Sequence, residues 1–122
     1  MSCIVFNCWQ TYCSVNAPLN STKRELTEQY VCQQLKTIQD IDIYYYTNDK
    51  GSCEIDFIVD TGELIVPLEV KAELNLRAKR LKAYRDKFSP KVSVRTSMAD
   101  YKREDCFINL PLYAIDQIVK II

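Results

Sequence analysis

Residues 54–72, EIDFIVDTGELIVPLEVKA, contain two runs of alternating polar and apolar residues separated by a Thr-Gly pair. Side chains alternate between the two faces of a strand, so this spacing predicts a β-hairpin with one apolar and one charged face. The polar positions are mostly acidic, and the second run closes with Glu69-Val70-Lys71. Carboxylates that lie opposite each other on neighbouring strands repel and destabilise the sheet unless a cation compensates their charge. The fold must therefore place a cation beside the acids, and that cation is a clue to function.

The length of the hairpin loop decides which acids meet. A loop of two or four residues places Glu54 opposite Glu69 with Asp56 diagonal to it, whereas a three-residue loop separates the charged faces. In the even register, Mg²⁺ or Mn²⁺ bound by carboxylate and backbone carbonyl oxygens would offset the repulsion. The alternative is a solvent-exposed face on which Lys71 neutralises the acids. Either Glu54 or Asp56 could be the acid that the first strand contributes.

Helix and strand signals on both sides of the hairpin predict an α/β fold. Thr22 and Glu25 form a capping box for a first helix, and Glu28 lies at the edge of its apolar face, which comprises Leu26, Tyr30, Val31, Leu35 and Ile38. The other expected elements are strands at 41–47, 53–60, 64–72 and 92–96, a helix at 76–88, an edge strand at 106–113 containing Pro111, and a terminal helix at 114–122.

This order predicts a mixed sheet flanked by helices, with an extra C-terminal strand and a short helix. The second helix is long enough to be the crossover between two parallel strands. Residues 1–20 show no clear period, so we expect a loosely organised lead-in to a single domain covering residues 21–122.

Composition removes several classes of protein and of mechanism. The chain is 48% hydrophobic and 26% charged, with neither a long apolar run nor a signal peptide, which predicts a cytoplasmic protein without a membrane span. Its six cysteines are expected to be thiols. The absence of histidine excludes Ser/His and Cys/His nucleophilic mechanisms and leaves carboxylate, lysine and metal chemistry.

Charge is strongly segregated along the chain although the net charge is zero. Eight acids and one lysine lie between Asp40 and Glu69, and nine basic residues and two acids lie between Lys71 and Arg95. An acidic hairpin followed by a basic helix suits a divalent cation held beside a phosphate backbone, although a salt-bridged surface gives the same counts.

These residues resemble a known nuclease superfamily. An acid late in one strand, a hairpin, E-x-K on the next strand and a glutamate on the preceding helix are similar to the PD-(D/E)xK nucleases, with Asp56, Glu69, Lys71 and Glu28 in the corresponding positions. The segment from Arg80 to Tyr84 resembles a Q-x-x-x-Y element, with arginine in place of glutamine. The strings LTEQYVCQQL, YYYTNDKGSCEIDFIVD, LIVPLEVKAE and INLPLYAI, within residues 22–115, resemble the domain of unknown function at the C-terminus of prokaryotic AAA-type ATPases.

The resemblance implies a restriction-endonuclease-like αβββαβ core and metal-dependent cleavage of DNA or RNA. Asp56, Glu69, the carbonyl of Val70 and Glu28 would ligate Mg²⁺ or Mn²⁺, and Lys71 would assist the attacking water. The residues implied for nucleic-acid binding are Arg77, Lys79, Arg80, Lys82, Tyr84 and Arg85. Tyr44 and Tyr46 share a strand face and suit either base stacking or packing. Two further readings stay open: a non-catalytic nucleic-acid-binding module, and an interaction domain that docks an ATPase module in trans. Whether two copies associate is also open.

Overall fold

The structure is a computed structural model that describes residues 3–7, 23–48, 54–72 and 79–122. Within these ranges the elements follow one another in the order β1 (Cys3–Asn7), α2 (Lys23–Lys36), β2 (Asp42–Asn48), β3 (Glu54–Asp60), β4 (Ile65–Val70), α3 (Lys79–Phe88), β5 (Ser93–Ser97), β6 (Lys102–Glu104), β7 (Phe107–Pro111), the 3₁₀ helix η1 (Leu112–Gln117) and α4 (Ile118–Ile121). The expected helix cap at Thr22 and the first turn of the second helix lie outside the described residues.

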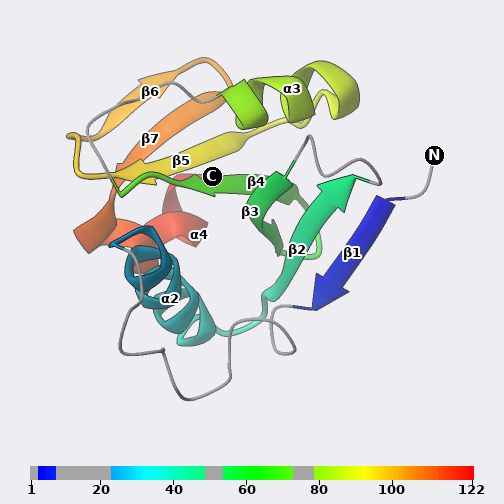
Figure 1. Ribbon diagram of the computed structural model, residues 1–122. Helices are drawn as coiled ribbons and strands as arrows, with labels where there is room; N and C mark the ends of the chain where they lie inside the picture. The colour runs from blue at the N-terminus through cyan, green and yellow to red at the C-terminus, as the bar shows by residue number, and fades with distance from the viewer. Residues whose placement is uncertain (1–2, 8–22, 49–53, 73–78) are drawn as a thin grey trace.

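The seven strands in the described residues form one mixed sheet in the order β1-β2-β3-β4-β5-β7-β6 (Figure 1). Strands β1 to β4 are antiparallel neighbours, and β4, β5 and β7 run parallel. Helix α3 lies in the connection between the parallel strands β4 and β5, as the sequence predicts. The α/β class and the mixed sheet flanked by helices are therefore confirmed.

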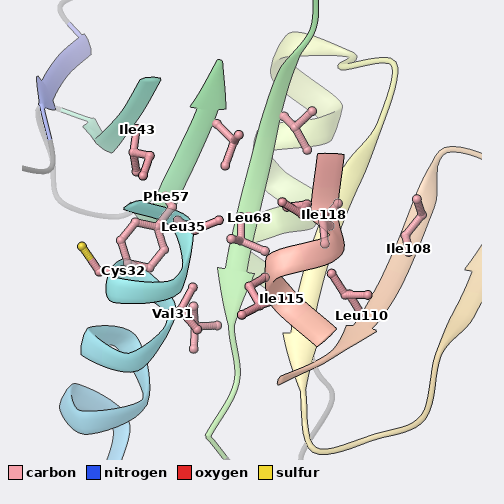
Figure 2. Packing of buried hydrophobic residues seen from close by; sticks show 14 residues of the cluster. Val31, Cys32, Leu35, Ile43, Phe57, Leu68, Ile108, Leu110, Ile115 and Ile118 are labelled. Carbon is pink, nitrogen blue, oxygen red and sulfur yellow. The ribbon is translucent and has the colours of Figure 1, made fainter. Parts of the chain in front are cut away.

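The two faces of the sheet carry separate hydrophobic clusters. On one face, Val31, Cys32 and Leu35 of α2 pack with Ile115 and Ile118 of the C-terminal helices against the central strands (Figure 2). The other face is covered by α3 and carries a smaller cluster. Buried residues of α3 join strand residues in this second cluster: Tyr46, Ile55, Ile58, Leu81 and Tyr84. Helix α2 and helix α3 therefore cover opposite faces.

Helix α2 presents a different face to the sheet from the one expected. Leu26 and Tyr30 are 52% and 40% exposed, whereas Glu28 and Cys32 are buried with Val31 and Leu35. The sequence contains two overlapping apolar stripes, and packing against β4 and η1 selects the one that includes the small Cys32. This rotation turns Glu28 from the edge of the apolar face into the protein interior.

The hairpin has an even loop, but its register is offset by two residues from the expected alignment. Phe57 pairs with Leu68 and Asp60 with Ile65, so Asp56, and not Glu54, is in line with Glu69. The four-residue loop is closed by Asp60, whose Oδ1 accepts the N–H of Gly62 at 2.8 Å. Gly62 has φ +85°, a left-handed conformation that glycine adopts without strain.

The edges of the sheet differ from the expectation in three ways. The lead-in of residues 1–20 contributes strand β1, which pairs with β2. The polar segment at Lys102–Glu104 forms β6, so β7 is internal and not an edge strand. Pro111 is nevertheless tolerated because it is the last residue of β7, where the missing N–H interrupts no further ladder. A short strand of charged residues gives no hydrophobic alternation and therefore no strand signal.

Candidate functional site

A β-bulge in strand β3 sets the orientation of the Asp56 side chain. Strand β3 pairs with β2 through Tyr44–Ile58 and Tyr46–Ile55, so two residues of β3, Asp56 and Phe57, face the single Tyr45. The bulge reverses the alternation of side chains, and as a result Ile55 and Ile58 join the same cluster while Phe57 joins the other. Bulges commonly redirect a side chain beside a functional site, and here the redirected side chain is an aspartate.

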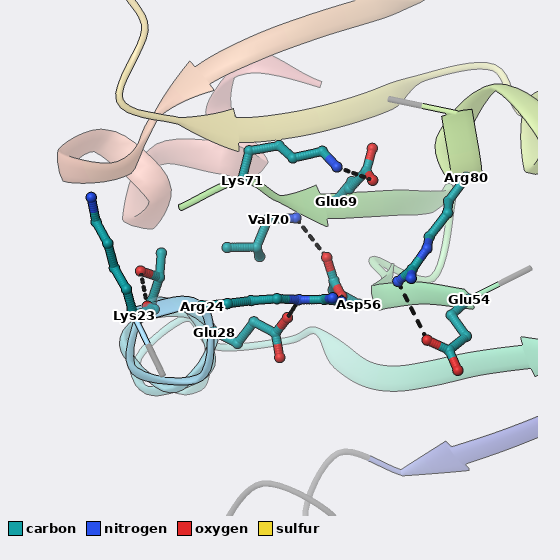
Figure 3. A network of polar contacts seen from close by, with 10 residues as sticks. Lys23, Arg24, Glu28, Glu54, Asp56, Glu69, Val70, Lys71 and Arg80 are labelled. Atoms are coloured by element: carbon teal, nitrogen blue, oxygen red, sulfur yellow. Dashed lines mark hydrogen bonds and ion pairs between the residues drawn. The ribbon is translucent and has the colours of Figure 1, made fainter. Parts of the chain in front are cut away.

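The carboxylate of Asp56 extends the hairpin ladder beyond its last backbone pair. The register pairs of β3 and β4 run from Asp60–Ile65 to Phe57–Leu68, and the N–H of Val70 then donates to Oδ2 of Asp56 at 2.8 Å (Figure 3). Asp56 is only 6% exposed. A buried side chain thus fixes the backbone of the E-x-K segment at its central residue.

Glu28 approaches the same aspartate from helix α2 through an arginine. Arg24 Nε lies 2.7 Å from Oε1 of Glu28, and its other end, Nη2, lies 3.4 Å from Oδ1 of Asp56. Glu28 and Asp56 are both buried, whereas the side chain of Arg24 is 52% exposed. The guanidinium therefore joins a helix acid to a strand acid at the rim of the site (Figure 3).

Glu69 has its own cation, on the side of β4 away from Arg24. Lys71 Nζ lies 3.1 Å from Oε1 of Glu69, and Figure 3 shows both side chains on the other side of the β4 ribbon from Asp56. Glu69 is 3% exposed. Its second oxygen, Oε2, is buried and has no hydrogen-bond donor among the described residues. A buried carboxylate oxygen without a donor is costly, which points to a group that binds there.

The acids perturb one another. Burial raises the pKa of Asp56, and the charge of Glu69 raises it further, while the Val70 N–H and Arg24 act in the opposite direction. Burial and the charge of Asp56 likewise raise the pKa of Glu28, against the effect of Arg24. The two carboxylates raise the pKa of Arg24. Raised carboxyl pKa values in a group of partnered, buried acids are typical of functional sites.

The raised pKa values predict an unusual pH dependence of stability. A carboxyl whose pKa is higher in the folded than in the unfolded protein stays protonated to a higher pH in the folded state. The free energy of unfolding therefore falls as pH rises through the interval between the two pKa values. The interval begins near the ordinary pKa of Asp and Glu, 3.8 and 4.5. We expect Glu28→Gln to reduce this fall, as measured by urea unfolding at a series of pH values in EDTA. Identical profiles for both proteins would contradict the assignment.

Asp56 and Glu69 offer carboxylate oxygens, the kind of donor that suits a hard cation. Asp56 and Glu69 are next in register on adjacent strands, and Val70, which follows Glu69, donates its N–H to Asp56. Mg²⁺ is commonly held by one or two carboxylates, with carbonyl oxygens and water completing its coordination. The donorless Oε2 of Glu69 is one of these carboxylate oxygens. Among the described residues, however, no three His, Cys, Asp or Glu side chains form a group that could hold a metal ion. Glu28 in particular is engaged by Arg24.

Helix α3 displays most of the expected basic residues. Lys79, Arg80 and Lys82 are exposed, and Arg80 Nη1 lies 3.4 Å from Glu54 Oε2. Arg85 is partly buried, with its guanidinium 5.5 Å from the centre of the Phe107 ring. Arg77 lies outside the described residues.

Tyr84, which the resemblance implies for nucleic-acid binding, lies in the second hydrophobic cluster. Tyr84 is 8% exposed and packs edge-to-face on Tyr46 at 5.1 Å between ring centres. Tyr46 is itself 3% exposed, so it packs and does not stack on bases. Both tyrosines belong to the second cluster, and the ring of Phe88 contacts each of them.

Sequence reasoning missed three residues of the site. Arg24 precedes Glu28 by one helical turn, a spacing that could have identified the pair. Tyr45 faces the bulge, and burial together with Glu54 and Asp56 raises its pKa. Arg95 pairs with Glu69 in the parallel register, and its Nε donates to Asn109 Oδ1 at 3.0 Å. Neither of the last two gives a signal in sequence, because strand pairing brings them to the site.

The comparisons with known proteins add a family. In the described part of the chain, no helix is long and apolar enough to cross a membrane. Searches of curated proteins and of solved structures gave no significant match. Residues 23–115, which are most of the chain and include every acid of the site, match the model of the family described as Domain of unknown function (DUF4143). The chain therefore belongs to the DUF4143 family.

Proposed function

We propose that this domain is a metal-dependent phosphodiesterase of the PD-(D/E)xK nuclease type. The observation that carries the proposal is that Asp56 and Glu69, which come next in register after the Phe57–Leu68 pair, are both buried, and that Oε2 of Glu69 has no donor among the described residues. Two anions in this position are stabilised by a hard cation. The sequence resemblance to the PD-(D/E)xK nucleases, and to the domain that follows AAA-type ATPases, supports the same reading.

The residues of the chain have distinct parts in this proposal. Asp56, Glu69 and the carbonyl of Val70 would hold Mg²⁺ or Mn²⁺, which supplies a more acidic bound water and compensation for charge on the phosphate. Lys71 is 27% exposed and held by Glu69, so its ammonium can donate to the attacking water or to a phosphate oxygen. The hydrogen bond from Val70 N–H fixes Asp56 relative to the E-x-K segment.

The decisive experiment is cleavage by the purified chain. Labelled single- and double-stranded DNA and RNA would be incubated with Mg²⁺, with Mn²⁺ and with EDTA, and the products resolved by size. We expect cleavage of at least one substrate with either metal and none in EDTA. A preparation of the Asp56→Asn protein excludes a contaminating nuclease. Absence of cleavage of all four substrates under both metals would refute the proposal.

A second candidate, a nucleic-acid-binding module without catalysis, is favoured by a specific observation. The acids of the site already have internal cations, because Arg24 contacts Glu28 and Asp56 while Lys71 contacts Glu69. Such an arrangement is stable without metal, as expected of a domain that has kept the fold and lost the reaction. In this case metal-independent binding would persist in EDTA. The ATPase module remains a proposed partner of either function, on the sequence resemblance alone.

Both candidates predict electrostatic binding through α3. Lys82 is exposed on this helix, and each lysine that neutralises a phosphate contributes about 0.7 to 0.9 to the slope of log K against log[salt]. We expect Lys82→Ala to weaken binding equally for different sequences and to reduce the slope by about this amount, measured by fluorescence anisotropy in EDTA. Lys120→Ala, an exposed lysine of α4 on the other face, is the matched control and should leave the slope unchanged. Equal effects of both variants would contradict binding through α3.

A further inference from the structure

Arg24 lies between two buried carboxylates, Glu28 and Asp56, and contacts both of them. Its guanidinium reaches from Glu28, at 2.7 Å, to Asp56, at 3.4 Å, and these acids come from a helix and a strand distant in sequence (Figure 3). Both acids are nearly inaccessible to solvent, whereas Arg24 is half-exposed. The cation of this pair of acids is thus supplied from the rim by the protein itself.

The two carboxylate oxygens of Asp56 have different hydrogen-bond partners. Oδ2 accepts the buried N–H of Val70 at 2.8 Å, so it is engaged in the backbone arrangement of the hairpin. Oδ1 faces Arg24 and is the less committed of the two oxygens. Any cation that approaches Asp56 from the α2 side therefore meets Arg24 at the same oxygen.

The contacts of Arg24 are unequal in a way that allows exchange. The Glu28 contact is short and joins residues one turn apart on the same helix, whereas the Asp56 contact is longer than the 2.7–2.9 Å of a strong charge-assisted hydrogen bond. A half-exposed arginine can rotate into solvent without opening either hydrophobic cluster. The link to Asp56 is therefore the one that a competing cation breaks.

The charge balance of the site favours either Arg24 or a divalent cation beside Asp56, but not both. When all of them are ionised, the three acids Glu28, Asp56 and Glu69 carry one more charge than the two cations that contact them, Arg24 and Lys71. Adding a divalent cation while Arg24 stays in place would leave an excess of positive charge and set two cations against the same aspartate. If Arg24 withdraws, the divalent cation and Lys71 together balance the three carboxylates.

We propose that Arg24 is an internal competitor for the divalent cation: it holds Asp56 and Glu28 in the metal-free protein and must leave Asp56 before Mg²⁺ or Mn²⁺ binds. This inference rests on the proposed function for the identity of the cation. The affinity for metal is then set by an exchange of guanidinium for metal, and Arg24 weakens it.

The test is the affinity for Mn²⁺ of the whole chain, measured by isothermal titration calorimetry. Arg24→Gln should bind Mn²⁺ about 5- to 150-fold more tightly than wild type, by analogy with the usual range of coupling between two binding events on one protein. Its thermal midpoint should be lower than wild type without metal and should rise more on adding Mn²⁺. Lys23→Gln is the matched control: it removes the same charge from the neighbouring, exposed position and should bind as wild type does.

The outcomes separate this inference from the proposed function. Equal affinities of wild type and Arg24→Gln, an equal gain in Lys23→Gln, or a gain that survives the addition of Asp56→Asn would each overturn the inference. Tighter binding by Arg24→Gln without cleavage by wild type refutes the nuclease function alone. If Arg24→Gln does not fold, Arg24→Lys keeps the charge but cannot reach both acids, and it too should bind Mn²⁺ more tightly than wild type. An unchanged affinity of Arg24→Lys would then overturn the inference.

Discussion

Replacing Asp56 by asparagine is expected to reduce metal-dependent cleavage by about 10²- to 10³-fold, the usual loss when one group that stabilises charge in the transition state is removed. Asparagine has nearly the same shape, and its carbonyl oxygen can still accept the N–H of Val70, so the hairpin should keep its geometry. What is lost is the negative charge that holds the cation. The measurement is the single-turnover rate on the substrate that wild type cleaves fastest, at saturating Mn²⁺.

Glu54→Gln is the matched control for this prediction. Glu54 lies two residues before Asp56 on the same strand, but it is partly exposed and pairs with Arg80. Its replacement should leave the cleavage rate within a few-fold of wild type. Asp56→Asn should unfold at or above the wild-type midpoint in EDTA, because it removes a buried charge whose pKa is raised. A Glu54→Gln protein that loses activity while Asp56→Asn keeps it would assign the strand acid to Glu54.

Replacing Phe57 by alanine is expected to lower the free energy of unfolding by about 3–5 kcal/mol, the range for removing a buried aromatic ring. Phe57 is fully buried beside the bulge, and its ring faces Leu35 and Cys32 of α2 (Figure 2). A loss of this size is a large part of the 5–15 kcal/mol that stabilises a typical domain, so the variant would be unfolded at temperatures that wild type survives. The measurement is urea unfolding followed by circular dichroism.

Tyr113→Ala is the control for the loss of an aromatic ring. Tyr113 is 79% exposed, and its replacement should change stability by no more than about 0.5 kcal/mol. A Phe57→Ala protein as stable as Tyr113→Ala would mean that Phe57 is not in the core, and the bulge that places Asp56 beside it would then be wrong too.

The site combines buried anions with cations drawn from three elements. Arg24 comes from α2, Lys71 follows β4, and Arg95 comes from β5, where its charge acts on Glu69 although burial lowers its own pKa. A nuclease and a binding module both need the fold that assembles these groups, and they differ in whether the internal cations yield to a metal. Under the proposals made above, the nuclease needs metal to displace Arg24 from Asp56, whereas the binding module does not.

Much of the fold was readable from local patterns. The alternation in 54–72 identified two strands but left the parity of their loop open, and the helix expected at 76–88 corresponds to α3. The polar strand β6 and the strand β1 in residues 1–20 were missed, since pairing with a neighbour, rather than an amphipathic pattern, makes them strands. The buried face of α2 was misjudged because two apolar stripes overlap on it, and only the shape of the sheet beneath selects between them.

By itself the sequence determined the class of fold and the kinds of group available for chemistry: carboxylates and lysine in the hairpin, arginine and lysine beyond it, and no imidazole. Those properties depend on residue type and on spacing along one segment. The tertiary structure alone decided that Asp56, rather than Glu54, is in line with Glu69, that Glu28 points inward, and that Arg24 bridges two acids. Register, helix rotation and a bulge set these positions, and each arises from packing between segments that no local pattern encodes.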